Sequence, residues 1–216
     1  MTPQTACQTV QAAIGKMPLG HHGLALATGV YEESVEVFHG RQISIFGPME
    51  GNFCPSASAV TVSRFWVQDN ATLWVNCLTT GSVGCRQWAI ADVINVVFDG
   101  TAPTALVANE TCRINTSGSL TLNGPVSAFA VAQNYSTIYL AGNIAVSQPN
   151  LSLAYFLRAI DATIDLSSAV FSGHALAAGL RYTLDHGVIV FPRAGSQSIP
   201  GDGSESINFS VCRPCN

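Results

Sequence analysis

Alternation of apolar and polar residues between positions 60 and 98 constrains the fold more than any other feature of the chain. Residues 60–67 and 72–76 are rich in β-branched and aromatic side chains, and the turn-like residues 68–71 separate them. Two such runs joined by so short a turn predict a β-hairpin. A further apolar run follows at residues 89–98. This stretch therefore predicts a sheet at the centre of the fold.

Cysteines frame the loop that follows the second run. Cys77 and Cys85 enclose the small and polar residues Leu-Thr-Thr-Gly-Ser-Val-Gly. We expect a Cys77–Cys85 disulfide, which would stabilise the fold by about 2–3 kcal/mol in the chain-entropy model. The closed loop would be a rigid feature at a sheet edge. It would serve either as a staple alone or as a support for a ligand.

Seven cysteines indicate maturation in an oxidising compartment. Cys212 and Cys215 have the spacing of half a zinc site or of a redox motif, but no second motif or following helix supports either reading. We expect structural disulfides instead, one closing this domain and one leading into a neighbouring domain. The sequence leaves open how Cys7, Cys54, Cys112, Cys212 and Cys215 are connected.

The composition fits one extracellular domain over residues 1–216. Only 10% of the residues are charged, with 9 Lys and Arg against 13 Asp and Glu, so the chain offers no basic surface for nucleic acid. No apolar run has the length of a membrane span, and the first residues lack the pattern of a signal peptide. We therefore expect an ectodomain fragment whose Met1 comes from the expression vector.

The chain has asparagine sequons, and glycans attached there would compensate for the low surface charge. About two N-x-[ST] matches are expected by chance, and the chain has more. Glycans at these positions would solubilise a surface that is poor in charge. The predicted sites are Asn70, Asn109, Asn115, Asn134, Asn150 and Asn208.

Short alternating segments with turn signals between them continue to residue 191, which is typical of a β-sandwich. We expect an all-β, antiparallel β-sandwich with additional loops and no repeat of fixed period. Residues 153–158 and 175–184 have helical propensity, but we expect tertiary context to make them strands. Residues 5–14 fit a helical turn or a strand equally well.

Neither catalysis nor metal binding is expected. A triad of Ser172, His174 and His186 with Asp185 lacks the G-x-S-x-G turn of a nucleophile elbow. His21 and His22 are adjacent, so on an extended segment their side chains point to opposite faces. We expect no enzyme activity, no metal and no cofactor.

Glycan binding needs an aromatic platform beside amide or guanidinium groups. Trp88 follows Arg86 and Gln87 just beyond the cysteine loop, and this is the best local combination in the chain. Trp66 and Trp74 lie in alternating strands, and we expect at least one of them in the core. The acidic balance favours neutral sugars at least as much as sialosides.

Two segments carry a resemblance to a known family: the cysteine-bounded loop 77–85 and residues 133–146, Gln-Asn-Tyr-Ser-Thr-Ile-Tyr-Leu-Ala-Gly-Asn-Ile-Ala-Val. Both resemble segments in the N-terminal domain of the spike receptor-binding subunit of gammacoronaviruses. Weaker similarities cover residues 43–54 and 18–25, and the segments follow the family's order between Pro18 and Ser152. The chain departs from the family in lacking a cysteine near Phe129, and Cys112 lies upstream.

This resemblance implies a galectin-like sandwich on the virion surface, within a homotrimeric spike. It implies attachment to a host glycan or protein receptor, and it adds His21 and His22 to the candidate sugar-binding residues Trp88, Arg86 and Gln87. The alternative is a structural module that shields the fusion machinery under glycans and has no ligand of its own.

Overall fold

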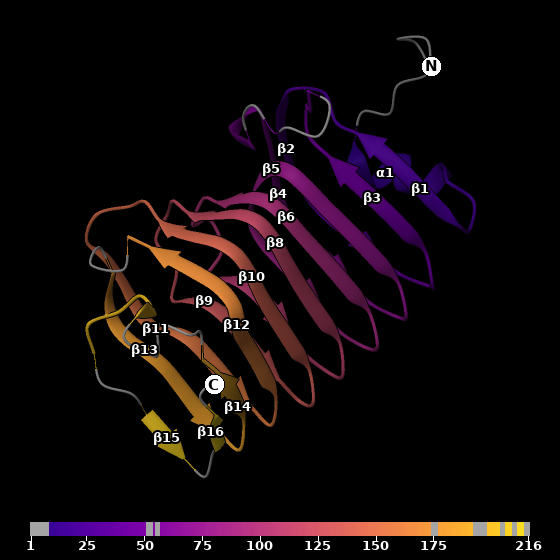
Figure 1. The fold of residues 1–216 in the computed structure, drawn as a ribbon. Coiled ribbons are helices and arrows are strands. Elements are labelled where there is room, and N and C mark those ends of the chain that lie inside the picture. Colours follow the sequence, from indigo (N-terminus) through magenta and orange to yellow (C-terminus); the bar gives the residue numbers. More distant parts are fainter. Residues whose placement is uncertain are drawn as a thin grey trace.

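Backbone hydrogen bonds wind a single sheet into a parallel β-solenoid, a stack of coils that runs from the N-terminal to the C-terminal end of the chain (Figure 1). The computed structural model describes residues 9–50, 54, 57–173, 177–191, 198–203, 206–208 and 211–213. Within these residues, sixteen strands belong to the sheet and every pairing between them is parallel.

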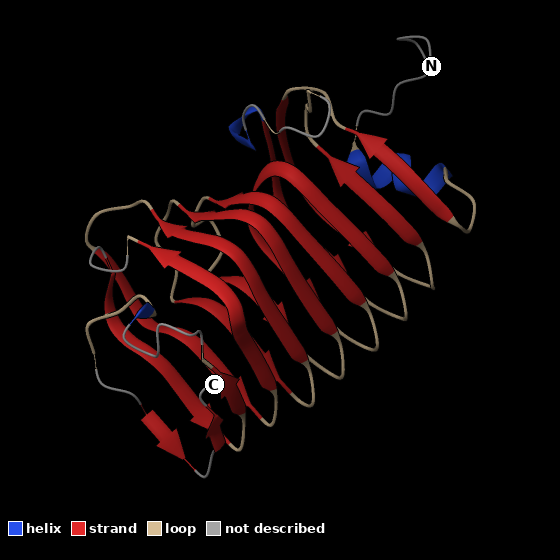
Figure 2. Ribbon diagram, viewed as in Figure 1, coloured by secondary structure: helices blue, strands red, loops and turns tan. Residues whose placement is uncertain are grey.

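The strands form two rows that β5 connects (Figure 2). The first row holds β1 (His21–Ala25), β3 (Gln42–Phe46), the start of β5 (Thr72–Cys85), β6 (Ile90–Phe98), β8 (Arg113–Leu122), β10 (Thr137–Val146), β12 (Thr163–Ser172), β14 (Val188–Val190) and β16 (Val211–Arg213). The second row holds β2 (Gly29–Val37), β4 (Val60–Val67), the end of β5, β7 (Thr104–Ala108), β9 (Ala128–Gln133), β11 (Leu151–Ile160), β13 (Ala177–Asp185) and β15 (Ser206–Asn208). Helix α1 (Val10–Lys16) and the 3₁₀ turn η2 (Ala57–Ala59) complete the described elements.

The all-β class is confirmed, whereas the galectin-like antiparallel β-sandwich is wrong. Short alternating strands between turns occur in both architectures, since alternation reports only that one face of a strand is buried. It does not report the direction of the neighbouring strand. In this chain each strand pairs with the strand one coil away, which runs in the same direction.

The predicted hairpin at residues 60–76 is wrong for the same reason. Asp69 and Asn70 have φ angles of 56° and 59°, the left-handed pair that a tight hairpin turn also uses. Here the turn sends the chain into the other row. The start of β5 pairs with β3 and β6, and β4 pairs in parallel with the end of β5, Thr61 opposite Thr79.

The long strands of the first row bend sharply in the middle. The bend falls at Cys77, Asn95, Gly118 and Gly142, which all have positive φ angles. Glycine is required at the bend of β10, because a methyl group on Gly142 would clash with the carbonyl oxygen of Gly118. The asparagine at the same place in β6 accepts a 3.0 Å hydrogen bond at Oδ1 from the backbone N–H of Ser119.

The solenoid interior is filled by columns of apolar side chains, one from each coil. In seven strands of the first row, the second residue points inward and has a fully buried aliphatic side chain. This column consists of Ile43, Leu73, Ala91, Ile114, Ile138, Ile164 and Ile189.

Phenylalanines form a second column. The Phe129 and Phe156 rings stack with centroids 4.8 Å apart, while Phe98 lies edge-on to Phe129 at 6.1 Å and Phe171 edge-on to Phe156 at 5.8 Å. Such contacts contribute beyond the burial of area alone. The coils are therefore joined by side-chain stacking as well as by backbone hydrogen bonds.

Three local expectations about helices and strands are settled. Of the two alternatives for residues 5–14, the helical one fits the described part, because α1 starts at Val10 with the Thr9 hydroxyl as its N-cap. The helix-prone residues 153–158 belong to β11, as expected. Residues 177–184 belong to β13, and residues 175 and 176 lie outside the described residues.

Replacing Phe129 tests the stacked interior. We expect Phe129→Ala to lower the free energy of unfolding by about 3–5 kcal/mol, because it leaves a cavity between two aromatic neighbours. Val170 is 61% exposed on β12, so Val170→Ala should change stability by less than about 0.5 kcal/mol. Urea titration of both variants measures the difference, and equal stabilities would contradict the stacked interior.

Candidate functional site

Tight turns line up along one edge of the solenoid, at the lower right of Figure 1. Each turn leads from a strand of the second row to the next strand of the first row, and five of the described turns have two consecutive residues with positive φ, while the β11–β12 turn has one, Asp161. We call this line the turn ridge, and its paired residues are His39–Gly40, Asp69–Asn70, Gln87–Trp88, Glu110–Thr111 and Asn134–Tyr135.

Hydrogen bonds between neighbouring turns make the turn ridge rigid. The backbone N–H of Gln87 donates to the Glu110 carbonyl at 2.9 Å, and the N–H of Thr111 donates to the Asn134 carbonyl at 3.0 Å. The Tyr135 N–H donates to the Asp161 carbonyl at 2.7 Å. The ladder of the sheet thus continues through the turns, so the turn side chains have fixed spacings.

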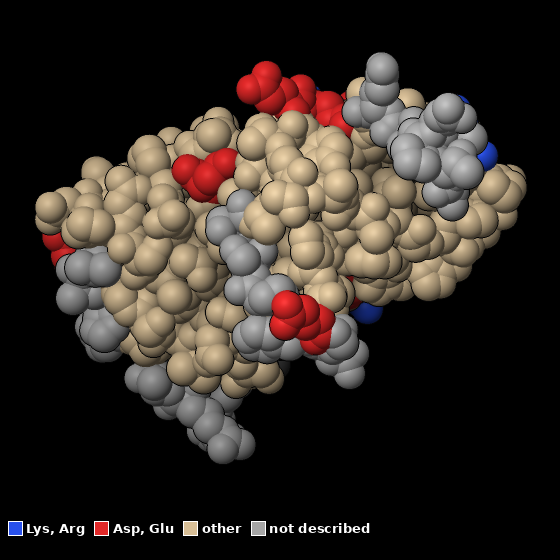
Figure 3. All heavy atoms as spheres, turned by 90° about the horizontal axis from the view of Figure 1, so that it is seen from above, with Lys and Arg blue, Asp and Glu red and all other residues tan. Residues whose placement is uncertain are grey.

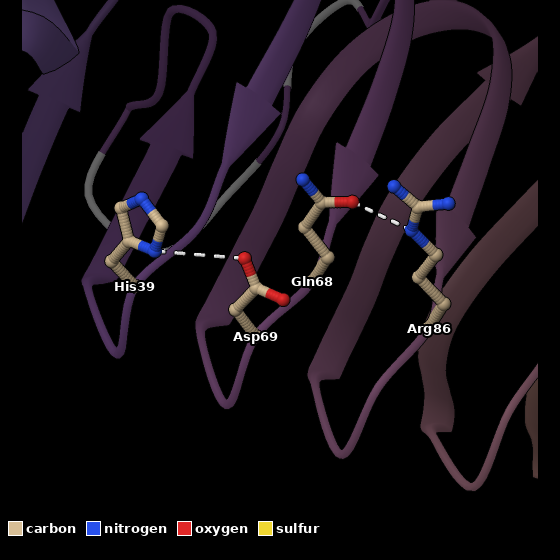
Figure 4. Close-up of polar contacts among 4 residues, drawn as sticks. All are labelled: His39, Gln68, Asp69 and Arg86. Atoms are coloured by element: carbon tan, nitrogen blue, oxygen red, sulfur yellow. Dashed lines mark hydrogen bonds and ion pairs between the residues drawn. The ribbon is translucent and has the colours of Figure 1, made fainter.

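Polar side chains also pair along the turn ridge. His39 Nδ1 lies 3.6 Å from Asp69 Oδ2, and Arg86 Nε donates to Gln68 Oε1 at 2.6 Å (Figure 4). Further along, Asn134 Nδ2 donates to Asn109 Oδ1 at 2.7 Å. Each pair joins side chains from neighbouring turns.

A groove opens where the turn ridge meets the outer face of the first row. It has a volume of about 340 Å³, and we call it the ridge groove. Its lining consists of Trp88, Ala89, Ile90, Thr111, Cys112, Arg113, Tyr135 and Thr137.

Two aromatic rings in the ridge groove are unusually open to solvent. Trp88 is 67% exposed and Tyr135 is 80% exposed. The guanidinium of Arg113 lies 5.5 Å from the centre of the Tyr139 ring, a cation–π contact. Within the described residues, this guanidinium has no hydrogen-bond or ion-pair partner. The groove therefore offers two apolar ring faces and a set of free N–H donors.

Of the predicted ligand residues, the structure places Trp88 in the ridge groove and Gln87 next to it on the turn ridge. Arg86 instead points to Gln68. His21 lies at the far end of the first row, with Nε2 2.9 Å from Ser44 Oγ and its ring 5.0 Å from that of Trp74.

The Nε2 atom of His22 is buried, and β3 and β5 separate the histidine strand β1 from β6, so neither histidine joins the site. The core position expected for Trp66 or Trp74 is also wrong, because both are only half-buried. Trp66 covers Gly84 on the outside of the second row.

Sequence reasoning missed Tyr135, Arg113, Thr111 and Thr137. Tyr135 lies far from Trp88 in sequence, and only the parallel stacking of turns brings the two rings to one groove. The available signal is a buried small residue directly before β5, β6, β8 and β10, at Ala71, Ala89, Cys112 and Ser136. Aligning the chain on these positions places Trp88 and Tyr135 in equivalent turns.

The predicted Cys77–Cys85 disulfide is wrong. Cys77 is bonded to Cys54 and Cys85 to Cys112, with Cα–Cα distances of 5.5 and 5.9 Å. Cys77 lies at the bend of β5 and Cys85 at its end, so one extended strand separates them. Cys7 and Cys215 lie outside the described residues, as does the side chain of Cys212.

The sequons fall on outward positions where they can be described. Asn70 and Asn134 are exposed on the turn ridge, with Asn109 half-buried beside it. Asn150 is exposed in a loop, and Asn115 is half-buried in β8, where its Nδ2 donates to Asp92 Oδ1 at 2.7 Å. The side chain of Asn208 lies outside the described residues.

The imagined catalytic triad does not assemble from its described members. Ser172 ends β12, whereas His186 lies in the turn after β13, at the edge where β12 begins. The whole length of β12 therefore lies between them. His186 instead pairs with Asp185 at 3.0 Å, and His174 lies outside the described residues.

The opposite edge of the solenoid has a second groove of about 490 Å³. It lies between the wider loops, at residues 100–103, 125–127 and 152–154, and no aromatic or charged side chain lines it. Seen from above, the surface has scattered Asp and Glu groups and very few Lys and Arg groups among mostly uncharged residues (Figure 3).

The fold and the disulfides define an all-β, disulfide-bonded parallel β-solenoid of the kind that matures outside the cytosol. Among the described residues, no helix combines the length and the hydropathy that a membrane crossing requires. The chain matches no protein-family model, no curated protein and no solved structure.

Removing the disulfide beneath the ridge groove tests the observed pairing. We expect Cys85→Ser with Cys112→Ser to lower the free energy of unfolding by about 3–4 kcal/mol, because the bond closes a long loop. Cys54→Ser with Cys77→Ser serves as the matched control and should have a similar effect. A non-reducing peptide map that shows a Cys77–Cys85 peptide would contradict both pairings.

Proposed function

We propose that this chain is an extracellular attachment module that binds a cell-surface glycan in the ridge groove. One observation carries the proposal: two exposed aromatic rings, Trp88 and Tyr135, share a groove with the Arg113 guanidinium, which has no hydrogen-bond or ion-pair partner among the described residues. Large exposed aromatic groups are costly to leave in water, so their clustering on a rigid surface favours a ligand.

The chemistry of the ridge groove suits a sugar. The apolar face of a pyranose packs on an indole or phenol ring, while its hydroxyl groups need donors and acceptors around the ring edge. Arg113 supplies donors, and the hydroxyls of Thr111 and Thr137 supply both donors and acceptors. Because backbone hydrogen bonds fix the turns, little entropy is lost when the site is filled.

The proposal rests on this site and not on the resemblance to coronavirus spikes, because the sandwich that the resemblance implies is not the fold. Location on a virion, membership of a homotrimer, a protein receptor and the lack of enzyme activity remain predictions. The absence of nucleic acid among the partners also remains a prediction, drawn from the acidic composition.

A glycan array tests the proposed function. We expect the domain, secreted from mammalian cells and multimerised on beads, to give a clear signal that falls at least about tenfold in Trp88→Asn, since an aromatic platform contributes more than 1 kcal/mol. Asparagine retains the left-handed turn conformation that Trp88 has.

His39→Asn is the matched control, because His39 has the same conformation on the same turn ridge but lies outside the groove. Its array signal should equal that of the wild-type domain. An array signal that survives in Trp88→Asn would refute binding in the ridge groove, and a silent array would refute the glycan function.

A second candidate, the glycosylated shielding module, is favoured by the position of the sequons. Asn70, Asn109 and Asn134 all lie on or beside the turn ridge, and Asn134 directly precedes Tyr135. A glycan on Asn134 would cover the ridge groove and compete with any ligand.

Glycopeptide mass spectrometry separates the two candidates. If the ridge groove binds a ligand, we expect Asn134 to be unoccupied in the secreted domain, because its Nδ2 is hydrogen-bonded to Asn109 and the groove must stay open. Full occupancy of Asn109 and Asn134, together with an array that stays silent after enzymatic deglycosylation, would favour shielding.

A further inference from the structure

The two exposed rings of the ridge groove have a defined separation. Trp88 and Tyr135 occupy equivalent turns, one before β6 and one before β10, and β8 lies between these strands. Neighbouring strands are about 4.8 Å apart, so the two turns are about 10 Å apart along the solenoid axis. A single sugar ring cannot stack on both aromatic side chains at that distance.

We infer that the ridge groove takes a linear, neutral oligosaccharide that lies along the solenoid axis and spans at least three sugars. This inference rests on the proposed function and specifies its ligand. One sugar stacks on Trp88 and another on Tyr135, and the sugar between them faces Arg113 and Thr111, which come from the intervening coil.

A linear chain fits because the protein groups repeat along the same axis. Each coil adds one turn to the turn ridge, and each turn places polar groups at the spacing of the sheet. Gln87, Glu110 and Asn134 are the first left-handed residues of three successive turns, and all three are exposed. A linear polymer of similar sugars presents hydroxyl groups at regular intervals to this row of turn residues. A branched glycan would turn away from the row at its branch point and contact only part of it.

The charges around the groove favour a neutral chain over a polyanionic one. Glu110 and Asp161 lie exposed on the turn ridge, and Asp92 lies on the outer face beside β8. The guanidinium of Arg86 is already bonded to Gln68, so Arg113 is the free cation at the groove among the described residues. Repeated carboxylates along a ligand would meet these acidic side chains and be repelled. Hydroxyl groups can bond to the carboxylates and to the guanidinium alike.

A chain-length series tests the inference on the intact 216-residue domain. The probes are β-1,4-linked glucose, mannose and galactose oligosaccharides of one to six sugars, with galacturonate oligomers of the same lengths as the charged comparison. By calorimetric titration we expect affinity for at least one neutral series to rise at least about tenfold from two to four sugars and then level off. Galacturonate oligomers should bind at least about tenfold more weakly than that series.

Single replacements connect this length dependence to the two rings. Trp88→Asn and Tyr135→Gly each remove one platform without straining the turn, and each should abolish the rise between two and four sugars. His39→Asn should retain it. Circular dichroism and thermal unfolding confirm that each variant is folded.

The outcomes separate this inference from the proposed function. A positive glycan array with affinity that does not depend on chain length would overturn the linear axial mode and leave glycan binding intact. Stronger binding of galacturonate than of every neutral series would overturn the neutral ligand. No binding of any series would overturn the inference, while the array decides the proposed function independently.

Discussion

Hydrogen bonding that continues through the tight turns is the constraint on which this structure depends. In a parallel pair of strands every residue has a fixed counterpart one coil away, and here the turn residues keep that register too. The left-handed residues of the turns make this possible, since they reverse the chain within a few residues without interrupting the ladder. Interior columns and the turn ridge are two results of the same register.

The register also explains why the candidate site lies on a turn edge. Interior positions are mainly apolar, because each side chain packs against the one in the next coil away from water. Turn side chains have no such requirement and remain open to solvent, yet their backbone is hydrogen-bonded to the next turn as the strands are to each other. The Cys85–Cys112 disulfide lies directly beneath, with Cys112 in the groove lining, and adds a covalent link between two coils.

Local features of the structure could be predicted from the sequence, and long-range ones could not. Alternation identified strands even at residues 153–158, where propensity favours a helix, because burial outweighs intrinsic preference. Trp88 was predicted as a ligand residue from its neighbours Arg86 and Gln87, although the Arg86 side chain is hydrogen-bonded to Gln68. The long-range features depend on which coil lies beside which. They are the direction of neighbouring strands, the disulfide partners of Cys77 and Cys85, and the proximity of Tyr135 to Trp88. The intervals between equivalent turns vary along the chain, so no fixed period revealed the coils.

Direct strand pairing joins each coil only to the coils before and after it, and this has a consequence for how such a molecule changes over evolutionary time. In architectures of this kind the stability is close to a sum of nearest-neighbour terms, so a whole coil can be gained or lost with only a local effect. Duplication of one coil would lengthen the molecule and add one more turn to its edge, while its cross-section stayed the same. Tandem duplication would therefore change the length of the molecule and the number of ligand subsites together, one coil at a time.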